Sequence, residues 1–271
     1  MCKLLSAGFF RLKKDITFWL FAILTIGISC LTLIRYYFSE NGVILDIVVN
    51  NYIQYIGLFI AIFVGIFVGK EYSEGIIRNK IIVGQSRLLI YLSKFIICVV
   101  ASVLCQLIYI CIVLIIGIPL FGKIQMPISQ FMLSILNTIL IVIVYCSIFN
   151  FIAMIFSEIT VSITINILIF ITMFIIEASI GYIANSSKYI TNSFWDNGIE
   201  TIISEELNPN YPGDAKVKSA KIIYLLIPQG QANKIANGNK DSLCQMPIYS
   251  VIITCTINLV GIYLFSKKEL K

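Results

Sequence analysis

The feature that most constrains this chain is a series of six apolar stretches, each about long enough to cross a membrane. They cover residues 16–38, 52–69, 95–121, 128–156, 159–183 and 248–265. Lipid offers the backbone no hydrogen-bond partners, so each stretch must satisfy its own backbone as a helix. The sequence therefore predicts an all-α integral membrane protein with six transmembrane helices.

The composition supports this class and excludes several others. Hydrophobic residues make up 59% of the 271 residues and charged residues 13%, against about 45–50% and about 25% in an average soluble protein. The chain has no histidine, which removes the commonest general base and metal ligand. Its eight cysteines form no closely spaced pair, which favours buried small side chains over metal or redox chemistry. We expect no catalytic residue, metal or cofactor in this chain.

The basic residues cluster in three segments between the apolar stretches, so we interpret the net charge of +6 as topology and expect no nucleic acid partner. The segments are the amino-terminal region with four basic residues, the loop after the second stretch with five, and the tail with three, including Lys271. An even number of stretches separates them, so all three can lie in the cytosol. On the opposite side, the loop after the first stretch contains only two charged residues, Glu40 and Asp46.

Two further segments complete a single membrane domain over residues 1–271. Residues 1–15 place apolar side chains at helical spacing among Lys and Arg, which predicts an amphipathic helix lying on the inner membrane surface. Residues 184–245 form a long polar region before the last stretch, with turn residues and balanced charge. We expect a small, partly helical cap outside the cell, with the apolar run 222–228 packed on the outer ends of the helices or dipping into the interface.

Residues 70–87 form a short charged stretch between two long apolar ones. Isoleucines supply an apolar side, and Glu74 and Arg78 stand four residues apart in the order that favours an ion pair on a helix. This pattern predicts one short amphipathic helix. An ordinary solvated helix and a helix gripped by another protein both fit it.

Three groups of residues, in the expected order, resemble the bacterial ABC-2 type transporter permeases. The segment "LLIPQGQANKI" at 225–235 resembles a motif before the last span of that family, and "GIYLFSKKELK" at 261–271 resembles its usual ending. The loop between the second and third stretches carries the remaining residues of the resemblance: Gly69, Glu71, Gly75, Arg78, Gly84, Ser86, Arg87, Ser93 and Lys94.

The resemblance implies a division of labour between subunits. In that family the permease is not an enzyme, and a separate ATPase subunit binds ATP and Mg. This sequence contains no glycine-rich phosphate loop, which agrees with that arrangement. The resemblance also implies a coupling helix at 70–87 that docks on the ATPase, and a second permease copy, identical or related. The residues it assigns to coupling are Glu71, Glu74, Gly75, Arg78, Asn79 and Arg87.

The second apolar stretch carries small residues at every fourth position, namely Gly57, Ala61, Gly65 and Gly69. This spacing lets two helices approach closely. The partner helix can belong to the same chain, or to a second permease copy at a dimer seam or pathway wall.

Polar residues inside the apolar stretches are candidates for a pathway or gate, chiefly Glu177, Asn166 and Asn137. A structural role as hydrogen-bonding groups between helices is the alternative interpretation.

The resemblance and the apolar composition together predict the membrane subunit of an ATP-driven exporter in the bacterial cell membrane, surrounded by membrane lipids, with both termini cytoplasmic. A hydrophobic or amphipathic substrate, such as an antimicrobial or cytolytic peptide, suits nearly uncharged helices. Export of a lipid, drug or ion is the alternative within the family. An intramembrane enzyme is disfavoured because histidine and paired carboxylates are missing, and a channel because no ring of charges is visible.

Overall fold

The computed structural model describes residues 1–39, 44–196, 199–239 and 242–268. Glu40 and Lys271, used above for topology, lie outside the described residues. Within the described part, six helices are long and apolar enough to cross a membrane, so the prediction of six spanning helices is confirmed by length and composition. Five of these helices are α2 (Ile16–Tyr37), α6 (Arg87–Phe121), α7 (Ile128–Ile155), α8 (Ile159–Ala184) and α11 (Met246–Lys267). The remaining one is α4 (Ile53–Ser73), which the short α3 (Leu45–Asn51) precedes almost without a break.

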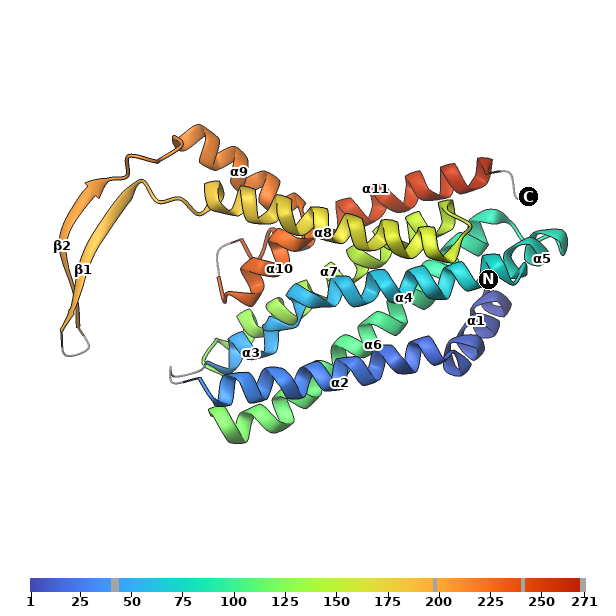
Figure 1. The fold of residues 1–271 in the computed structure, drawn as a ribbon, viewed down its shortest axis with the longest axis horizontal. Helices are drawn as coiled ribbons and strands as arrows, with labels where there is room; N and C mark the ends of the chain where they lie inside the picture. Colours follow the sequence, from blue (N-terminus) through green and yellow to red (C-terminus); the bar gives the residue numbers. More distant parts are fainter. Residues whose placement is uncertain (40–43, 197–198, 240–241, 269–271) are drawn as a thin grey trace.

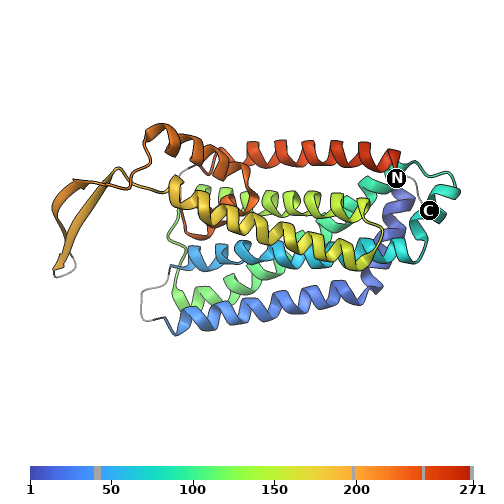
Figure 2. The same ribbon diagram turned by 45° about the horizontal axis from the view of Figure 1, so that its top comes forward.

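The long helices lie side by side along the length of the molecule (Figures 1 and 2). The amino terminus, the end of α11 and the short α5 (Ile76–Ile82) share one end, which we call the basic end. The segments between α8 and α11 occupy the opposite end. The grouping of the three basic segments on one side, expected from the sequence, therefore matches the fold.

At the basic end two helices extend beyond the predicted spans, and at the opposite end a predicted loop contains a helix. α6, which contains the predicted third span, already begins at Arg87, because Ser86 caps it and the charge of Lys94 is buried beside another charge. α4, which contains most of the predicted second span, continues to Ser73. The predicted loop before it holds α3, where the carboxylate of Asp46 accepts hydrogen bonds from the backbone of Gln125 and Met126 at 3.1 and 2.9 Å.

The predicted amino-terminal helix is present as α1 (Cys2–Lys14), which crosses the basic end at an angle to the bundle (Figure 1). Its apolar side packs on α6, where Gly8 lies so close to Ile97 that a Cβ would stand 2.1 Å from the side chain. Asp15 then caps α2 by accepting a hydrogen bond from the backbone of Thr17 at 2.8 Å. The turn between α1 and α2 is therefore fixed by a side chain.

The region between α8 and α11 is only partly helical, as expected, and it also contains strands that the all-α prediction missed. β1 (Tyr189–Asp196) and β2 (Ile199–Leu207) pair antiparallel as a hairpin that projects from the bundle. Their β-branched and aromatic residues favour strands, a signal that the apolar pattern of the rest of the chain obscured. α9 (Asp214–Leu226) and α10 (Pro228–Ala236) follow and return the chain to the bundle.

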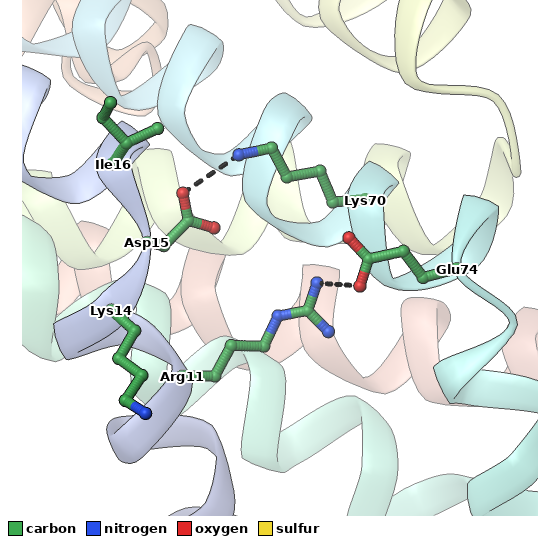
Figure 3. A pocket seen from close by; sticks show the side chains of 6 residues that line it. All are labelled: Arg11, Lys14, Asp15, Ile16, Lys70 and Glu74. Atoms are coloured by element: carbon green, nitrogen blue, oxygen red, sulfur yellow. Dashed lines mark hydrogen bonds and ion pairs between the residues drawn. The ribbon is translucent and has the colours of Figure 1, made fainter.

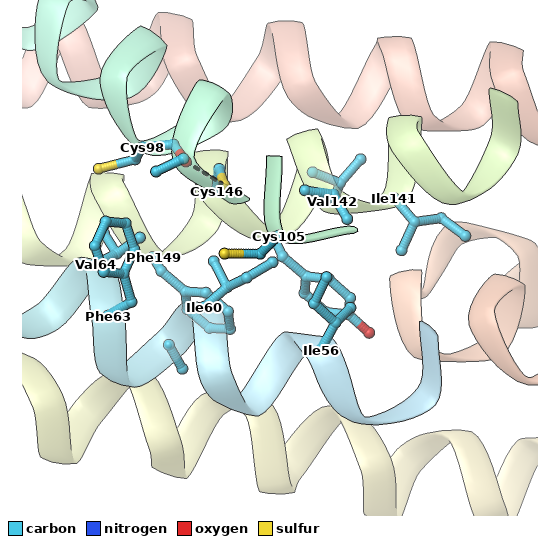
Figure 4. Close-up of a cluster of buried hydrophobic side chains, with 14 of the residues drawn as sticks. Ile56, Ile60, Phe63, Val64, Cys98, Cys105, Ile141, Val142, Cys146 and Phe149 are labelled. Atoms are coloured by element: carbon cyan, nitrogen blue, oxygen red, sulfur yellow. Dashed lines mark hydrogen bonds between the residues drawn. The ribbon is translucent and has the colours of Figure 1, made fainter. Parts of the chain in front are cut away.

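The core lies at the centre of the bundle, where α4, α6 and α7 meet (Figure 4). Ile60, Cys105 and Phe149 are fully buried there. In the most apolar windows of α4 and α7, 67% and 72% of residues are buried, against 17% and 22% in α8 and α11. α4 and α7 are therefore central, whereas α8 and α11 present most of their apolar side chains outward, as expected for helices facing lipid or another subunit.

Candidate coupling site at the basic end

The stretch predicted as one helix over 70–87 is divided into three parts. α4 ends at Ser73, α5 runs from Ile76 to Ile82, and α6 begins at Arg87. Gly75 separates the first two because its φ of +66° lies in the left-handed region, which favours glycine. Gly84, with φ +86°, makes the second turn. α5 is thus a short helix between two turns, each made by a glycine.

Glu71 is the centre of a buried charge cluster. Its side chain is 1% exposed, and its carboxylate contacts the Nζ atoms of Lys94 and Lys80, the latter at 2.9 Å, while Arg11 lies 3.7 Å away. These four residues, which we call the Glu71 cluster, belong to α1, α4, α5 and α6. Three cations compensate one buried carboxylate, so the cluster joins four helices and does not offer Glu71 to an outside partner.

A second set of ion pairs joins α1 and the start of α2 to α4 (Figure 3). Arg11 donates to Glu74 at 2.6 Å, and Lys70 donates to Asp15 at 3.0 Å. Burial alone would raise the pKa of Asp15, but the hydrogen bonds from Thr17 and the ion pair with Lys70 outweigh it, so the pKa lies below its ordinary value. The prediction of an ion pair between Glu74 and Arg78 is wrong. The turn at Gly75 interrupts the helix, and Glu74 pairs with Arg11 instead.

The guanidinium group of Arg87 is also hydrogen-bonded within the chain. Its Nη1 donates to the carbonyls of Phe265 and Ser266 at 3.2 and 2.9 Å, and to that of Lys268. An arginine at a helix end satisfies carbonyls that lack intrahelical partners. Lys268 in turn donates to the carbonyl of Met154, and burial lowers the pKa of this lysine to about 8. Arg87 therefore ties the start of α6 to the end of α11.

Five of the exposed residues on α5 and at the start of α6 form what we call the α5 surface. They are Arg78, Asn79, Ile82, Val83 and Leu88, while the exposed Glu74 is already paired with Arg11. Ile82 and Val83 are 71% and 78% exposed, so two adjacent apolar side chains lie uncovered at the charged end of the bundle. Within the described part of the chain, Arg78 forms no ion pair. Of the six residues proposed for coupling, Arg78 and Asn79 are the two that lie on this surface.

The row of small residues on α4 packs against α8 of the same chain. A Cβ on Gly65 would stand 3.1 Å from the Cα of Ile163, and one on Gly69 would stand 3.0 Å from the Cα of Ile159. Gly57 faces the ring of Phe170 in the same way. The carbonyl of Ala61 accepts a hydrogen bond from Asn166 at 3.2 Å. Of the two interpretations, close packing within one chain is the one observed.

The other two candidate pathway residues lie at the opposite end. Glu177 is 5% exposed, and its Oε1 accepts hydrogen bonds from Tyr224 at 2.7 Å and Asn233 at 2.6 Å. Asn137 donates to the carbonyl of Leu243 at 2.9 Å. Glu177 thus joins α8 to α9 and α10, and Asn137 joins α7 to the segment before α11, as in the structural interpretation considered from the sequence.

The segment 225–235 was noted in the sequence for its resemblance, but no role was predicted for the buried glutamines of α10. Gln229 accepts a hydrogen bond from Tyr145 at 2.6 Å, and Gln231 accepts one from Ser250 at 2.8 Å. Gly230 between them lies against Tyr224, where a Cβ would stand 2.2 Å from the carbonyl oxygen. The polar "PQGQ" run directly after an apolar segment was the available signal, because buried amides need partners.

A scan against protein-family models finds no match, and a search of curated proteins finds none either. The class defined by the structure is therefore a multi-pass membrane protein with six candidate spans.

Proposed function

We propose that this chain is the membrane subunit of an ATP-driven ABC-2 type exporter, with ATP and Mg bound by a separate ATPase subunit. The observation that supports this most is the α5 surface: an exposed, partly apolar face on a short helix at the basic end. Exposed apolar side chains, beside an arginine that has no ion pair among the described residues, suit contact with another protein better than contact with water.

The Glu71 cluster would carry movement from α5 into the bundle. Lys80 on α5, Glu71 on α4 and Lys94 on α6 share one buried contact. Separating a buried charge from its partners costs about 3–5 kcal/mol. A displacement of α5 by an ATPase is therefore transmitted to α4 and α6, and through Arg11 to α1, rather than absorbed by the loop.

The orientation follows from the clustering of basic residues at one end. The basic end, with both termini and α5, faces the cytosol, and the hairpin with α9 and α10 lies outside. A bacterial cell membrane, a second copy of this chain or a related permease, and the surrounding lipids complete the proposed assembly.

The proposed substrate is a hydrophobic or amphipathic molecule, with an amphipathic peptide as the first candidate. A groove between α2 and α4 is lined by apolar side chains, among them Leu20, Phe21 and Phe59. Such a surface suits apolar cargo or the second permease copy and suits sugars poorly. A lipid, drug or ion efflux permease remains the alternative within the same class.

The test is co-purification of this chain with an ABC ATPase encoded beside it. We expect a stable complex whose ATP hydrolysis rises when amphipathic peptide is added, and no hydrolysis by the membrane chain alone. Hydrolysis by the homogeneous chain, or a neighbourhood without a phosphate-loop protein that binds it, would refute the proposal.

A further inference from the structure

The end opposite the basic end contains an open pocket whose floor carries one buried carboxylate. It has a volume of about 610 Å³ and lies between α8, the base of the hairpin and α10. We call it the Glu177 pocket. Its lining includes Glu177, Tyr182, Asn185, Ser186, Asn208 and Asn233.

Glu177 keeps one oxygen available to a ligand. Both of its hydrogen bonds, from Tyr224 and Asn233, go to Oε1. Among the residues described, Oε2 has no hydrogen bond and Glu177 has no ion pair. A carboxylate that is 5% exposed and forms no ion pair with the described residues is costly to bury, which makes it a candidate for binding a positive group.

The neighbouring groups include an acceptor for a ligand that donates hydrogen bonds. Asn208 Nδ2 donates to the carbonyl of Ser187 at 3.1 Å, and Ser186 Oγ donates to that of Ile183 at 2.7 Å. These donors are used, while the Ser186 hydroxyl oxygen can still accept a hydrogen bond. Tyr182, 74% exposed on the rim, adds an aromatic ring, and such rings attract cations.

The charge and size of the pocket select among cations. The described residues contain no group of three or more acidic, cysteine or histidine side chains that could hold a metal ion. A single carboxylate suits a single positive charge, and a pocket of this size admits a side chain or a chain terminus rather than a bare ion. α9, which packs on α8 through Ala220 and Tyr224, leaves Ile222 and Ile223 about half exposed nearby. A charged group in the pocket and apolar groups on α9 together match an amphipathic, lysine-bearing peptide.

We infer that the Glu177 pocket binds the primary ammonium group of an amphipathic peptide at the face of the membrane opposite the basic end. That the ligand is a peptide rests on the proposed function. The pocket adds that this peptide carries a positive charge.

The experiment uses the full chain in phosphatidylcholine nanodiscs, without ATPase or ATP, and a fluorescently labelled helical peptide of leucine and lysine. Anisotropy titration gives the affinity. Glu177→Gln keeps an oxygen for Tyr224 and Asn233 but removes the charge, so we expect affinity to fall about tenfold, the size of one charge-assisted hydrogen bond. Acetylating the peptide lysines should produce a similar loss with the unmodified chain.

The matched control is Asp214→Asn, which removes an exposed acidic charge from α9 outside the pocket lining. It should leave affinity unchanged. Should Glu177→Gln fail to fold, Tyr182→Ala on the rim is expected to weaken binding about threefold. Equal losses in the Asp214 control, undiminished binding of the acetylated peptide, or no loss in either pocket variant would overturn the inference.

Nanodiscs of phosphatidylethanolamine provide a second arm, because that headgroup also carries a primary ammonium. If the original chain and Glu177→Gln bind the peptide with equal affinity in this lipid, the pocket binds the lipid headgroup and the assignment to a peptide is wrong. Neither result bears on ATPase binding at the basic end, so failure here is distinguishable from failure of the exporter proposal.

Discussion

Two buried glutamates, one near each end of the bundle, are held in opposite ways. Glu71 has three cations from three other helices around it. Glu177 has two neutral donors, both on one oxygen. A buried carboxylate surrounded by cations joins helices and is closed to ligands, whereas one held by neutral groups keeps attraction for an outside charge. The difference supports the two proposals made above, a structural link between helices at the basic end and a ligand-binding pocket at the opposite end.

The largest effect is expected at Glu71. Replacing Glu71 with Gln leaves Lys94, which is 0% exposed, without its counter-charge, and should lower the free energy of unfolding by about 3–5 kcal/mol. Thermal unfolding in detergent measures this. Glu71→Gln combined with Lys94→Met should recover part of the loss, since the lone charge is gone. A loss below about 1 kcal/mol for Glu71→Gln would show that the cluster does not stabilise the fold.

The same substitution at the opposite end should cost much less. Glu177→Gln keeps both hydrogen bonds in neutral form, so we expect a loss of about 1 kcal/mol or less in the same unfolding assay. Equal losses at positions 71 and 177 would remove the distinction between the two glutamates.

At the α5 surface, a substitution should weaken binding of the proposed ATPase without lowering the stability of the chain. Arg78→Glu alters an exposed side chain that forms no ion pair with the part of the chain the structure describes, so stability should change by about 0.5 kcal/mol or less. Co-purification of the proposed ATPase should nevertheless fall severalfold and become more sensitive to salt. Asn79→Ala tests the neighbouring position with a smaller expected change. Unaltered co-purification of Arg78→Glu would exclude Arg78 from the contact.

The smallest effect concerns Asp15 and pH. Because its pKa is lower in the folded chain than in the unfolded chain, its contribution is present above the unfolded pKa and is lost as pH falls through the folded pKa. Asp15→Asn keeps a helix cap but removes the charge, and should reduce stability at pH 7 by about 0.5 kcal/mol. This difference should shrink below about pH 4. A difference that stays constant across that range would show that charge is not the cause.

The spans could be predicted because the hydropathy of about 20 consecutive residues is enough to identify a spanning helix, without knowledge of which helices pack together. The hairpin at residues 189–207 was missed because β signals are short and depend on context. Gly75 was visible in the sequence, but its left-handed conformation was not, and that conformation redirects Glu74 from Arg78 to Arg11.

The sequence pointed to Glu71 and Arg78 but not to Arg11 and Lys80, and it did not show the environment of Glu71. The sequence places Glu71 in a charged stretch, which suggested a solvent-facing position. It is buried because Lys94, 23 residues later, returns to it on α6. Pairings over that distance depend on how helices pack, which neither periodicity nor charge spacing shows. The same holds for Gln229 and Tyr145, which are 84 residues apart.

The length of α6 sets how far the basic end stands from the membrane. Its 35 residues rise about 1.5 Å each, or about 52 Å in all, against a hydrocarbon thickness of about 30 Å. Even at a tilt of about 40°, the upper end of the observed range, such a helix is still about 10 Å longer than the hydrocarbon is thick, counted over both ends. If the other end of α6 stops at the hydrocarbon boundary, the whole excess lies at the basic end, and a protein that binds α5 would meet it at the level of the lipid headgroups. Shortening α6 by one turn near Arg87 would lower that contact toward the hydrocarbon while leaving the spans their length.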